Sequence, residues 1–192
     1  FGEYAGRMTE PQSRRIEHLR RWKEGADFSR EFNVAAPIEH MNAFLARNYP
    51  TYTNAVPDVV RAKIFIRELA QWERDSKMPN LTLIQLPSDH TFGTTPGVST
   101  PKAMVADNDL AVGQIVEALS HSKFWPKMAI LGIEDDPQAG WDHVSGYRTT
   151  CFVASPFSRR GVTVSTQYNT TSVLRTIEQI LGIRPMNLFD AS

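Results

Sequence analysis

The sequence predicts an α/β fold, in which helices lie on the faces of a sheet. Three short apolar runs, at residues 81–86, 128–133 and 151–154, have the length and continuity of buried strands. Around them lie stretches whose apolar residues recur at intervals of three to five, as on one face of a helix. Alternation of these two patterns is typical of a sheet covered by helices.

The first region, residues 1–56, is predicted to be irregular, with one or two short helices. Prolines at positions 37 and 50 break it into loop-like pieces. A basic stretch after Pro11 predicts a short helix with a solvated face, because the rest of the chain balances its charge. Its members are Arg14, Arg15, Arg20, Arg21 and Lys23. Residues 57–192 form the predicted α/β core.

Start and stop signals mark the helices of this core. One helix is expected to begin at Pro57, and another at Thr100, a capping residue followed by a first-turn proline. The last helix is expected to stop at Gly182, with a proline just beyond. Residues 162–164 predict a short edge strand, because a turn precedes them.

The composition argues against several classes of partner. The 192 residues include 21 Lys+Arg and 21 Asp+Glu, so a formal net charge of zero gives no dominant attraction to nucleic acid or an anionic membrane. No apolar run approaches the roughly 20 residues that span a bilayer. The single cysteine, Cys151, excludes an intramolecular disulfide, and its place within a strand predicts an inert buried thiol.

Polar residues follow the predicted strands. Asp89 and His90 come after the first strand, residues 134–136 (Glu-Asp-Asp) after the second, and Ser155 after the third. In open α/β sheets, ligands bind beyond the carboxyl ends of the strands. The coincidence of these positions predicts a functional site there.

Asp135 and Asp136 belong to a run of three acids, which repel one another unless a cation or several donors neutralise them. They are therefore either ligands of a divalent ion or part of a solvated loop. Asp142 and His143, a few residues on, favour the metal site, because carboxylate and imidazole together suit zinc or a transition metal.

His90 stands beside Asp89 in a glycine- and proline-containing loop. There it can act as a ligand, a phosphate donor or a general acid, or it can serve a structural role by capping a carbonyl. The cluster Asp107-Asn108-Asp109 lacks calcium-loop spacing and is predicted to be a solvent-facing or loop-bonding polar cluster. Arg148 has two interpretations, a partner for phosphate or a partner for Asp142.

Several blocks of sequence occur in an order and spacing that identify a relative. They are LPSDHT at 86–91, VADND at 105–109, EDDPQAGWDHV at 134–144, SP at 155–156 and RTIEQILG at 175–182. Together they resemble the phosphoesterase family of bacterial phospholipases C and acid phosphatases, which belongs to the alkaline phosphatase superfamily. The similarity covers most of the chain.

The resemblance implies the C-terminal part of an alkaline-phosphatase-like three-layer sandwich, with a mainly parallel sheet flanked by helices. It implies hydrolysis of a phosphate-ester substrate with a divalent metal ion (Zn, Mn, Ca or Mg) as cofactor, and a periplasmic or secreted location. Asp135 and Asp136 match the paired metal-binding acids of the family. His143, and His90 with Asp89, match positions that bind a second metal or contact the phosphoryl group.

Two departures limit this resemblance. Tyr147 stands where close family members have histidine, and the family's nucleophilic Ser or Thr lies N-terminal to the matched region. Thr91 and Thr94 are near the predicted site, but neither matches the nucleophile position. This chain is therefore expected to be the C-terminal portion of an enzyme, inactive alone, whose N-terminal half completes the site.

Two other functions compete with the hydrolase. A non-catalytic binding domain with a vestigial metal site is favoured by Tyr147 and by the missing nucleophile. A phosphate-accepting receiver pocket around Asp135 and Asp136 is disfavoured, because receiver domains carry their acid pair after the first strand and the histidines would then have no role.

Overall fold

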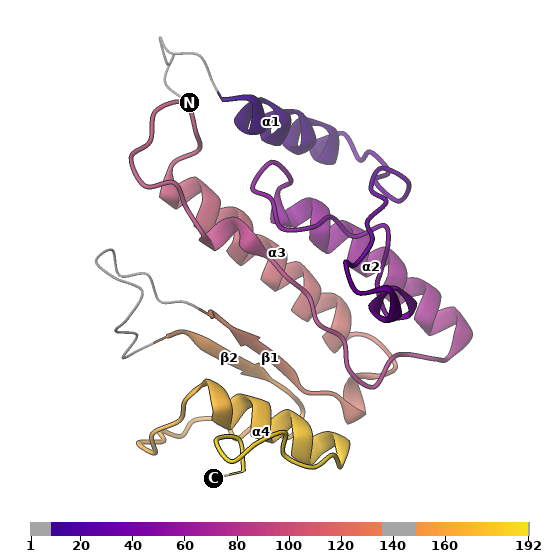
Figure 1. Cartoon of the computed structure of the whole chain (residues 1–192), viewed down its shortest axis with the longest axis vertical. Helices are drawn as coiled ribbons and strands as arrows, with labels where there is room; N and C mark the ends of the chain where they lie inside the picture. The colour runs from indigo at the N-terminus through magenta and orange to yellow at the C-terminus, as the bar shows by residue number, and fades with distance from the viewer. Residues whose placement is uncertain (1–8, 136–148, 192) are drawn as a thin grey trace. The chain divides into compact units, whose positions relative to one another are not determined.

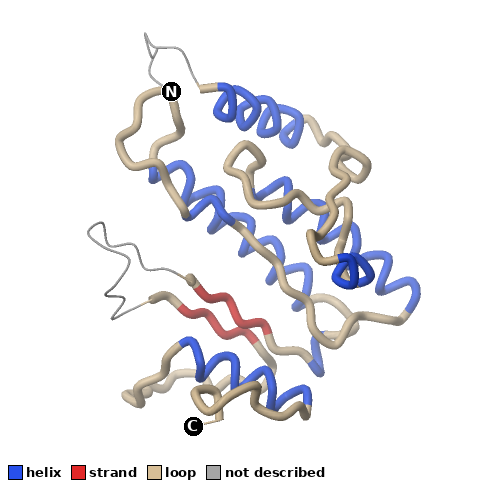
Figure 2. The backbone as a smooth tube through the Cα atoms, in the orientation of Figure 1, coloured by secondary structure: helices blue, strands red, loops and turns tan. Residues whose placement is uncertain are grey.

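The chain divides into two units, Phe1–Ser122 and Lys123–Ser192, and the regular elements described in the first unit are helices (Figures 1 and 2). The structure is a computed structural model that describes residues 9–135 and 149–191. The first unit contains α1 (Glu10–Lys23), α2 (Asp58–Asp75) and α3 (Pro101–Ser120). Two short 3₁₀ helices, η1 (Glu39–Ala43) and η2 (Pro87–Asp89), lie in the connections between them.

The helix starts predicted from capping residues are confirmed. Thr100 accepts a hydrogen bond from the Ala103 backbone N–H at the start of α3, and Pro101 occupies the first turn. The second helix begins directly after Pro57, as predicted, although no side chain of its own cap residue satisfies its first N–H groups. Those groups find a partner on α3, described below.

The core of the first unit lies between α2 and α3, which pack against each other. Its buried apolar residues recur at helical spacing, as an amphipathic face requires. On α2 they are Val59, Val60, Ala62, Ile64, Phe65 and Leu69, and on α3 Met104, Ala111, Ile115 and Leu119. Phe28 extends this core into the connection between α1 and α2, where Trp22, Phe32 and Tyr49 pack around it.

The first predicted strand, residues 81–86, is wrong. The segment forms no ladder with any described residue, and Leu83 is 84% exposed. A strand needs a neighbouring strand whose backbone forms hydrogen bonds with its N–H and C=O groups. Here side chains take two of them: the Tyr49 hydroxyl donates to the Gln85 carbonyl at 2.8 Å, and Asn108 Nδ2 donates to the Leu86 carbonyl at 2.9 Å.

The second unit contains η3 (Trp125–Lys127), β1 (Ile130–Ile133), β2 (Cys151–Ala154) and α4 (Thr170–Leu181). Both strands confirm predicted strands, although the first begins two residues later than its apolar run. They pair antiparallel, with Ile130 opposite Ala154, whereas the predicted sheet is mainly parallel. The structure is therefore α/β in its content of helices and strands, with a two-stranded antiparallel sheet among the described residues.

The last helix ends as predicted. Gly182 adopts the left-handed conformation, with φ 69°, and its N–H donates to the Gln179 carbonyl. Asn169 caps the other end of α4 and forms a capping box with Ser172. The predicted edge strand at 162–164 is wrong: it has no strand partner in the described part of the chain, and Val162 and Val164 are exposed.

None of the helices that the structure describes combines the length and the apolar character that crossing a membrane would require.

Candidate functional site

His90 follows a tight turn that the 3₁₀ helix η2 creates. Its backbone N–H lies 3.2 Å from the Pro87 carbonyl oxygen and 3.1 Å from Asp89 Oδ1. The side chains of both Asp89 and His90 are exposed. An acid and an imidazole therefore stand side by side at the surface of the first unit, on a turn whose backbone is held in place.

Two residues of the connection before α2 also contact His90. Asn54 Nδ2 donates to the His90 carbonyl at 2.9 Å. The Tyr52 ring meets the His90 ring edge to face, with centroids 6.1 Å apart and planes at 89°. Within the described residues, no hydrogen bond engages the ring nitrogens of His90, so the imidazole is open to a ligand.

A buried pair of carboxylates anchors the turn below His90. Ser88 is buried, and its backbone N–H donates to Asp58 Oδ2 at 2.9 Å. Its hydroxyl donates to Asp107 Oδ2 at 2.8 Å. Because Asp58 begins α2 and Asp107 lies on α3, the turn is tied to both helices of the core.

Asp107 also caps α2. Its carboxylate accepts the backbone N–H of Asp58 at 2.8 Å and that of Val59 at 3.2 Å, which are among the first N–H groups of the helix and have no partner within it. Of the two interpretations of Asp107, Asn108 and Asp109, loop bonding is confirmed for the first two residues. Asp109 is exposed.

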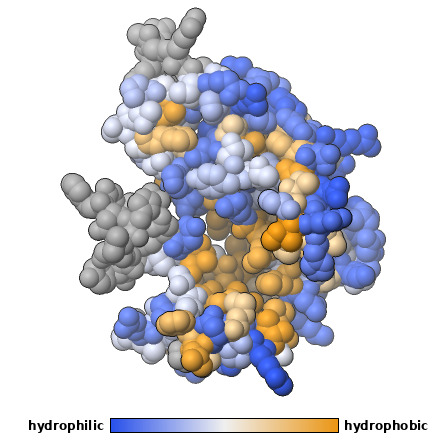
Figure 3. All heavy atoms as spheres, in the orientation of Figure 1, coloured by the Kyte–Doolittle hydropathy of each residue, from blue (hydrophilic) through white to orange (hydrophobic). Residues whose placement is uncertain are grey.

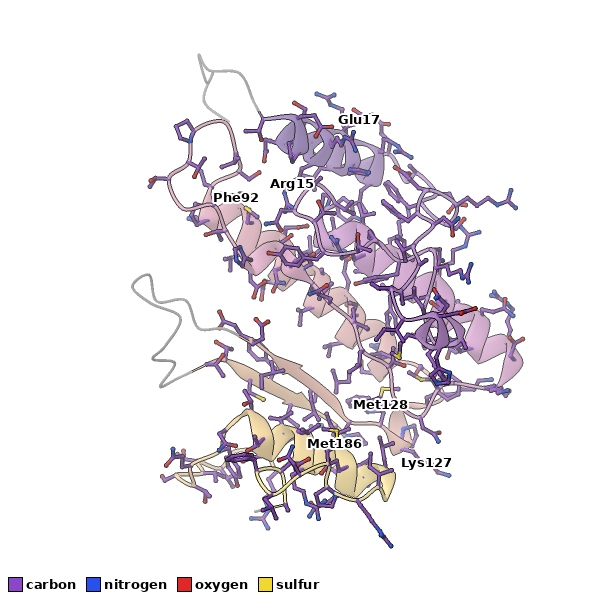
Figure 4. All side chains as sticks on the ribbon, in the orientation of Figure 1. Arg15, Glu17, Phe92, Lys127, Met128 and Met186 are labelled. Atoms are coloured by element: carbon purple, nitrogen blue, oxygen red, sulfur yellow. The ribbon has the colours of Figure 1, made fainter. Side chains whose placement is uncertain are left out.

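Arg15 corrects the prediction that the basic stretch of α1 has a solvated face. It is 2% exposed, whereas Arg14 and Arg20 are exposed. Figure 4 shows Arg15 on the side of α1 that faces the rest of the first unit, and Glu17 on the outer side. The Arg15 guanidinium donates to Asp107 Oδ2 at 2.6 Å. Arg15 is therefore buried because it pairs with the buried carboxylate of Asp107, which would otherwise lack a cationic partner.

Four buried charged side chains of the first unit balance one another in charge. Arg15 and Arg61 carry two positive charges, Asp58 and Asp107 two negative ones, and all four side chains are buried. Burial raises the pKa of Asp58, and the hydrogen bonds from Ser88 and Asn108 offset this only in part. Arg61 Nη1 lies 3.6 Å from Asp58 Oδ1. We call Arg15, Asp58, Arg61, Ser88 and Asp107 the buried polar cluster.

The predicted acidic site falls largely outside the described residues. Asp136, Asp142 and His143 lie outside them, as do Tyr147 and Arg148. Asp135 is described: it follows β1 and is exposed. Just before it, the Glu134 N–H donates to the Thr150 carbonyl at 3.1 Å, and Thr149 Oγ1 donates to the Glu134 carbonyl at 2.7 Å.

No three His, Cys, Asp or Glu side chains within residues 9–135 and 149–191 form a group that could hold a metal ion. Asp89 and His90 belong to the first unit and Asp135 to the second. Their convergence on one cationic centre therefore stays a prediction from the sequence.

Ser155 and Cys151, at the two ends of β2, differ in burial. Ser155 is buried, its hydroxyl donates to the Met128 carbonyl at 2.8 Å, and it accepts the Phe157 N–H at 3.2 Å. Cys151 corrects a prediction: it is exposed, not buried. Continuous apolar character suggested a strand buried on both faces, but β2 has exposed side chains at three of its four positions.

Sequence reasoning missed the residues that hold His90. Tyr52 and Asn54 lie in a segment predicted to be irregular, and the basic stretch that contains Arg15 predicts a solvated face. Arg15 and Asp107 are 92 positions apart, so no motif spacing links them. The one usable signal was the polar cluster 107–109 inside an otherwise apolar helix pattern, for which loop bonding was one of the two interpretations.

The sequence was also compared with known proteins, and a family model matches it. A model of the Phosphoesterase family matches residues 22–184. No curated protein and no solved structure matches the chain. The matched range contains Asp89, His90 and Asp135, together with Asp58 and Asp107 of the buried polar cluster.

Proposed function

Because this chain belongs to the phosphoesterase family, we propose that it acts as a metal-dependent hydrolase of phosphoric esters. Family membership supports hydrolysis of a phosphoric ester as the class of reaction. The observation that carries the proposal is the exposed pair Asp89 and His90, which stands on a turn anchored to buried carboxylates. In such an arrangement the imidazole is accessible to a ligand, while the turn that carries it is held in place by hydrogen bonds.

The role of His90 follows from what its side chain can do. Its imidazole contacts the Tyr52 ring and is otherwise exposed. Hydrolysis of a phosphoric ester leaves an alkoxide, which an imidazolium can protonate, and the same N–H groups can donate to a phosphoryl oxygen. We assign His90 this contact with the phosphoryl group or the leaving oxygen, and His143 a similar contact.

Asp135, Asp136, Asp142 and His143 are the residues that we propose to hold the divalent ion. Their oxygen and nitrogen donors are those that Zn, Mn, Ca or Mg accept in proteins, and the exposed carboxylate of Asp135 fits such a ligand. When bound, the ion supplies positive charge for the phosphoryl oxygens.

The remaining parts of the proposal concern the rest of the enzyme. No residue of this chain matches the family's nucleophilic Ser or Thr, so we propose that residues outside these 192 supply it. We also propose that the described helices and strands belong to a three-layer sandwich of the alkaline phosphatase type, in which further strands make the sheet mainly parallel.

Calorimetric titration of the chain with Mn²⁺ and with Zn²⁺ tests the metal site. We expect binding in the unaltered chain and its loss in Asp135→Ala, because a missing carboxylate ligand leaves the site without part of its compensating charge. Asp109→Ala, which removes an exposed carboxylate of α3, is the matched control and keeps the binding. An unaltered chain that binds neither ion would favour the non-catalytic binding domain.

Hydrolysis of a chromogenic aryl phosphate by the natural protein tests the reaction. We expect activity that a chelator removes and that added divalent metal restores, and its loss in His90→Ala. Full activity after complete removal of metal would refute the metal dependence.

A further inference from the structure

We infer that Arg15 is a positioning residue for His90, an inference that rests on the role proposed for His90 above. The Arg15 guanidinium donates hydrogen bonds to two segments that hold His90. One is Ser88, two positions before it, and the other is Asn54, which holds its carbonyl. Arg15 therefore connects α1 to the placement of a residue 75 positions further along the chain.

The first connection runs through the start of the turn. Arg15 Nη2 donates to Ser88 Oγ at 3.2 Å and to Asp107 Oδ2 at 2.6 Å, while the Ser88 hydroxyl itself donates to Asp107 at 2.8 Å. Guanidinium, hydroxyl and carboxylate thus close a three-membered ring of hydrogen bonds. Because Ser88 is fully buried, it cannot exchange these partners for water without opening the turn.

The second connection runs through the segment before α2. Arg15 Nη1 donates to the Asn54 carbonyl at 3.0 Å. The side chain of the same Asn54 donates to the His90 carbonyl at 2.9 Å. The edge-to-face contact between Tyr52 and the His90 ring lies in the same segment. Arg15 therefore holds Asn54, the residue that holds the His90 backbone, while Arg61 holds the carbonyls on either side of Tyr52, at Thr51 and Thr53.

These contacts need an arginine rather than any cation. The guanidinium presents two nitrogens in a fixed plane, and here one nitrogen serves Asn54 and the other serves Ser88 and Asp107. A lysine ammonium in the same place would keep the charge beside Asp107 without the fork. Arg15→Lys therefore separates pairing of the buried charge from positioning of His90.

The end of the loop that contains His90 is tied to the same helix. Gln12 lies one turn before Arg15, and its amide donates to Ser99 Oγ at 2.8 Å and accepts the Ser99 N–H at 2.9 Å. Both Gln12 and Ser99 are buried. The buried face of α1 thus holds the loop of residues 88–99 at both of its ends.

NMR of the 192-residue chain tests the inference, with the His90 ring signals assigned through His90→Gln. Two quantities are measured: the Tyr52–His90 ring contact, as a nuclear Overhauser effect, and the response of the His90 signals to inorganic phosphate. In Arg15→Lys we expect loss of the ring contact and about tenfold weaker phosphate binding, since small displacements of a contacting group cost large factors. Arg14→Lys changes the neighbouring exposed arginine and is expected to alter neither.

A second variant keeps the test decisive if Arg15→Lys does not fold. Ser88→Ala removes one hydroxyl and leaves the ion pair between Arg15 and Asp107 in place. We expect it to keep the helical circular dichroism of the unaltered chain and to weaken both the ring contact and phosphate binding, by less than Arg15→Lys does. A purely structural role for Arg15 would change thermal stability and leave both His90 measurements as they are.

The outcomes separate this inference from the proposed function. If folded Arg15→Lys and Ser88→Ala keep the ring contact and the phosphate response, the positioning role is wrong and the role of His90 stands. If phosphate leaves the His90 signals of the unaltered chain unchanged while the variants lose the ring contact, the phosphoryl contact is wrong and the positioning role stands. Equal losses in Arg14→Lys would also overturn the inference.

Discussion

The two units bury different kinds of residue. In the first unit, apolar side chains of α2 and α3 form a core, and the buried polar cluster includes Asp58 of α2 and Asp107 of α3. In the described part of the second unit, the buried residues are polar: Ser155, Glu178 and Asp190. None of the described apolar side chains of this unit is fully buried: they are half-buried or exposed, and Figure 3 shows hydrophobic side chains gathered over this unit. The exposed ones include Phe152, Phe157, Ile180, Leu188 and Phe189.

This difference shows where stability comes from in each unit. Burial of apolar area is the main favourable term in folding, so the first unit draws on its own helices for it. The described elements of the second unit have apolar residues that are at most half-buried, and local hydrogen bonds also hold these elements. Asp190 accepts the backbone N–H groups of Met186 and Asn187 at 2.9 and 2.8 Å, and Asn169 caps α4.

The largest expected effect is that of Asp107→Ala in the first unit. The change leaves Arg15 buried without its partner and removes the cap of α2, which together cost about 4 kcal/mol. Urea unfolding followed by circular dichroism measures the loss. Asp109→Ala is the control on the same helix and is expected to change stability by less than about 0.5 kcal/mol. A small effect of Asp107→Ala would show that this ion pair contributes little.

The next largest expected effect is the loss of stability when a buried phenylalanine of the first unit is replaced by alanine, compared with an exposed one of the second. Phe65 is buried on α2 and meets the Trp72 ring edge to face, so Phe65→Ala is expected to cost about 3 kcal/mol through lost burial and the cavity that remains. Phe152 is 62% exposed on β2, and Phe152→Ala is expected to cost less than about 0.5 kcal/mol. The same unfolding experiment measures both. Equal costs would contradict the contrast between the units.

The smallest effect concerns two carboxylates whose pKa is lowered for different reasons. A hydrogen bond from Arg67, with help from Ser29, lowers the pKa of exposed Asp27 to about 2. Burial raises the pKa of Asp190, but the N–H groups of Met186 and Asn187 outweigh burial and bring it below its usual range. Salt near 1 M, where charges are screened beyond about 3 Å, should raise the first pKa toward its ordinary value and leave the second nearly unchanged.

NMR titration of the two carboxyl signals, at low and high salt, checks this difference. Because the folded pKa of Asp27 lies below its unfolded value, the stabilisation by Arg67 is present above about pH 4 and is lost as the pH falls toward 2. Arg67→Ala should bring the pKa of Asp27 back toward 3.8 without changing that of Asp190. Equal responses of the two groups to salt would mean that the cation near Asp27 is not the cause.

The sequence by itself determined the features that depend only on residues close to one another along the chain. Thr100 and Gly182 set the start of α3 and the end of α4, because capping and left-handed backbone act within a single turn. The strands at Ile130–Ile133 and Cys151–Ala154 followed from continuous apolar runs. The adjacent pair Asp89 and His90 is likewise a feature of the sequence alone.

The tertiary structure alone decided which polar residues are buried and which strands pair. Arg15 and Asp107 are ordinary members of a basic and an acidic stretch until folding brings them within 2.6 Å of each other across 92 positions. Residues 81–86 have the pattern of a strand, yet a strand exists only where a neighbour accepts its hydrogen bonds. Long-range partners of this kind lie beyond any local pattern, since they depend on the path of the whole chain.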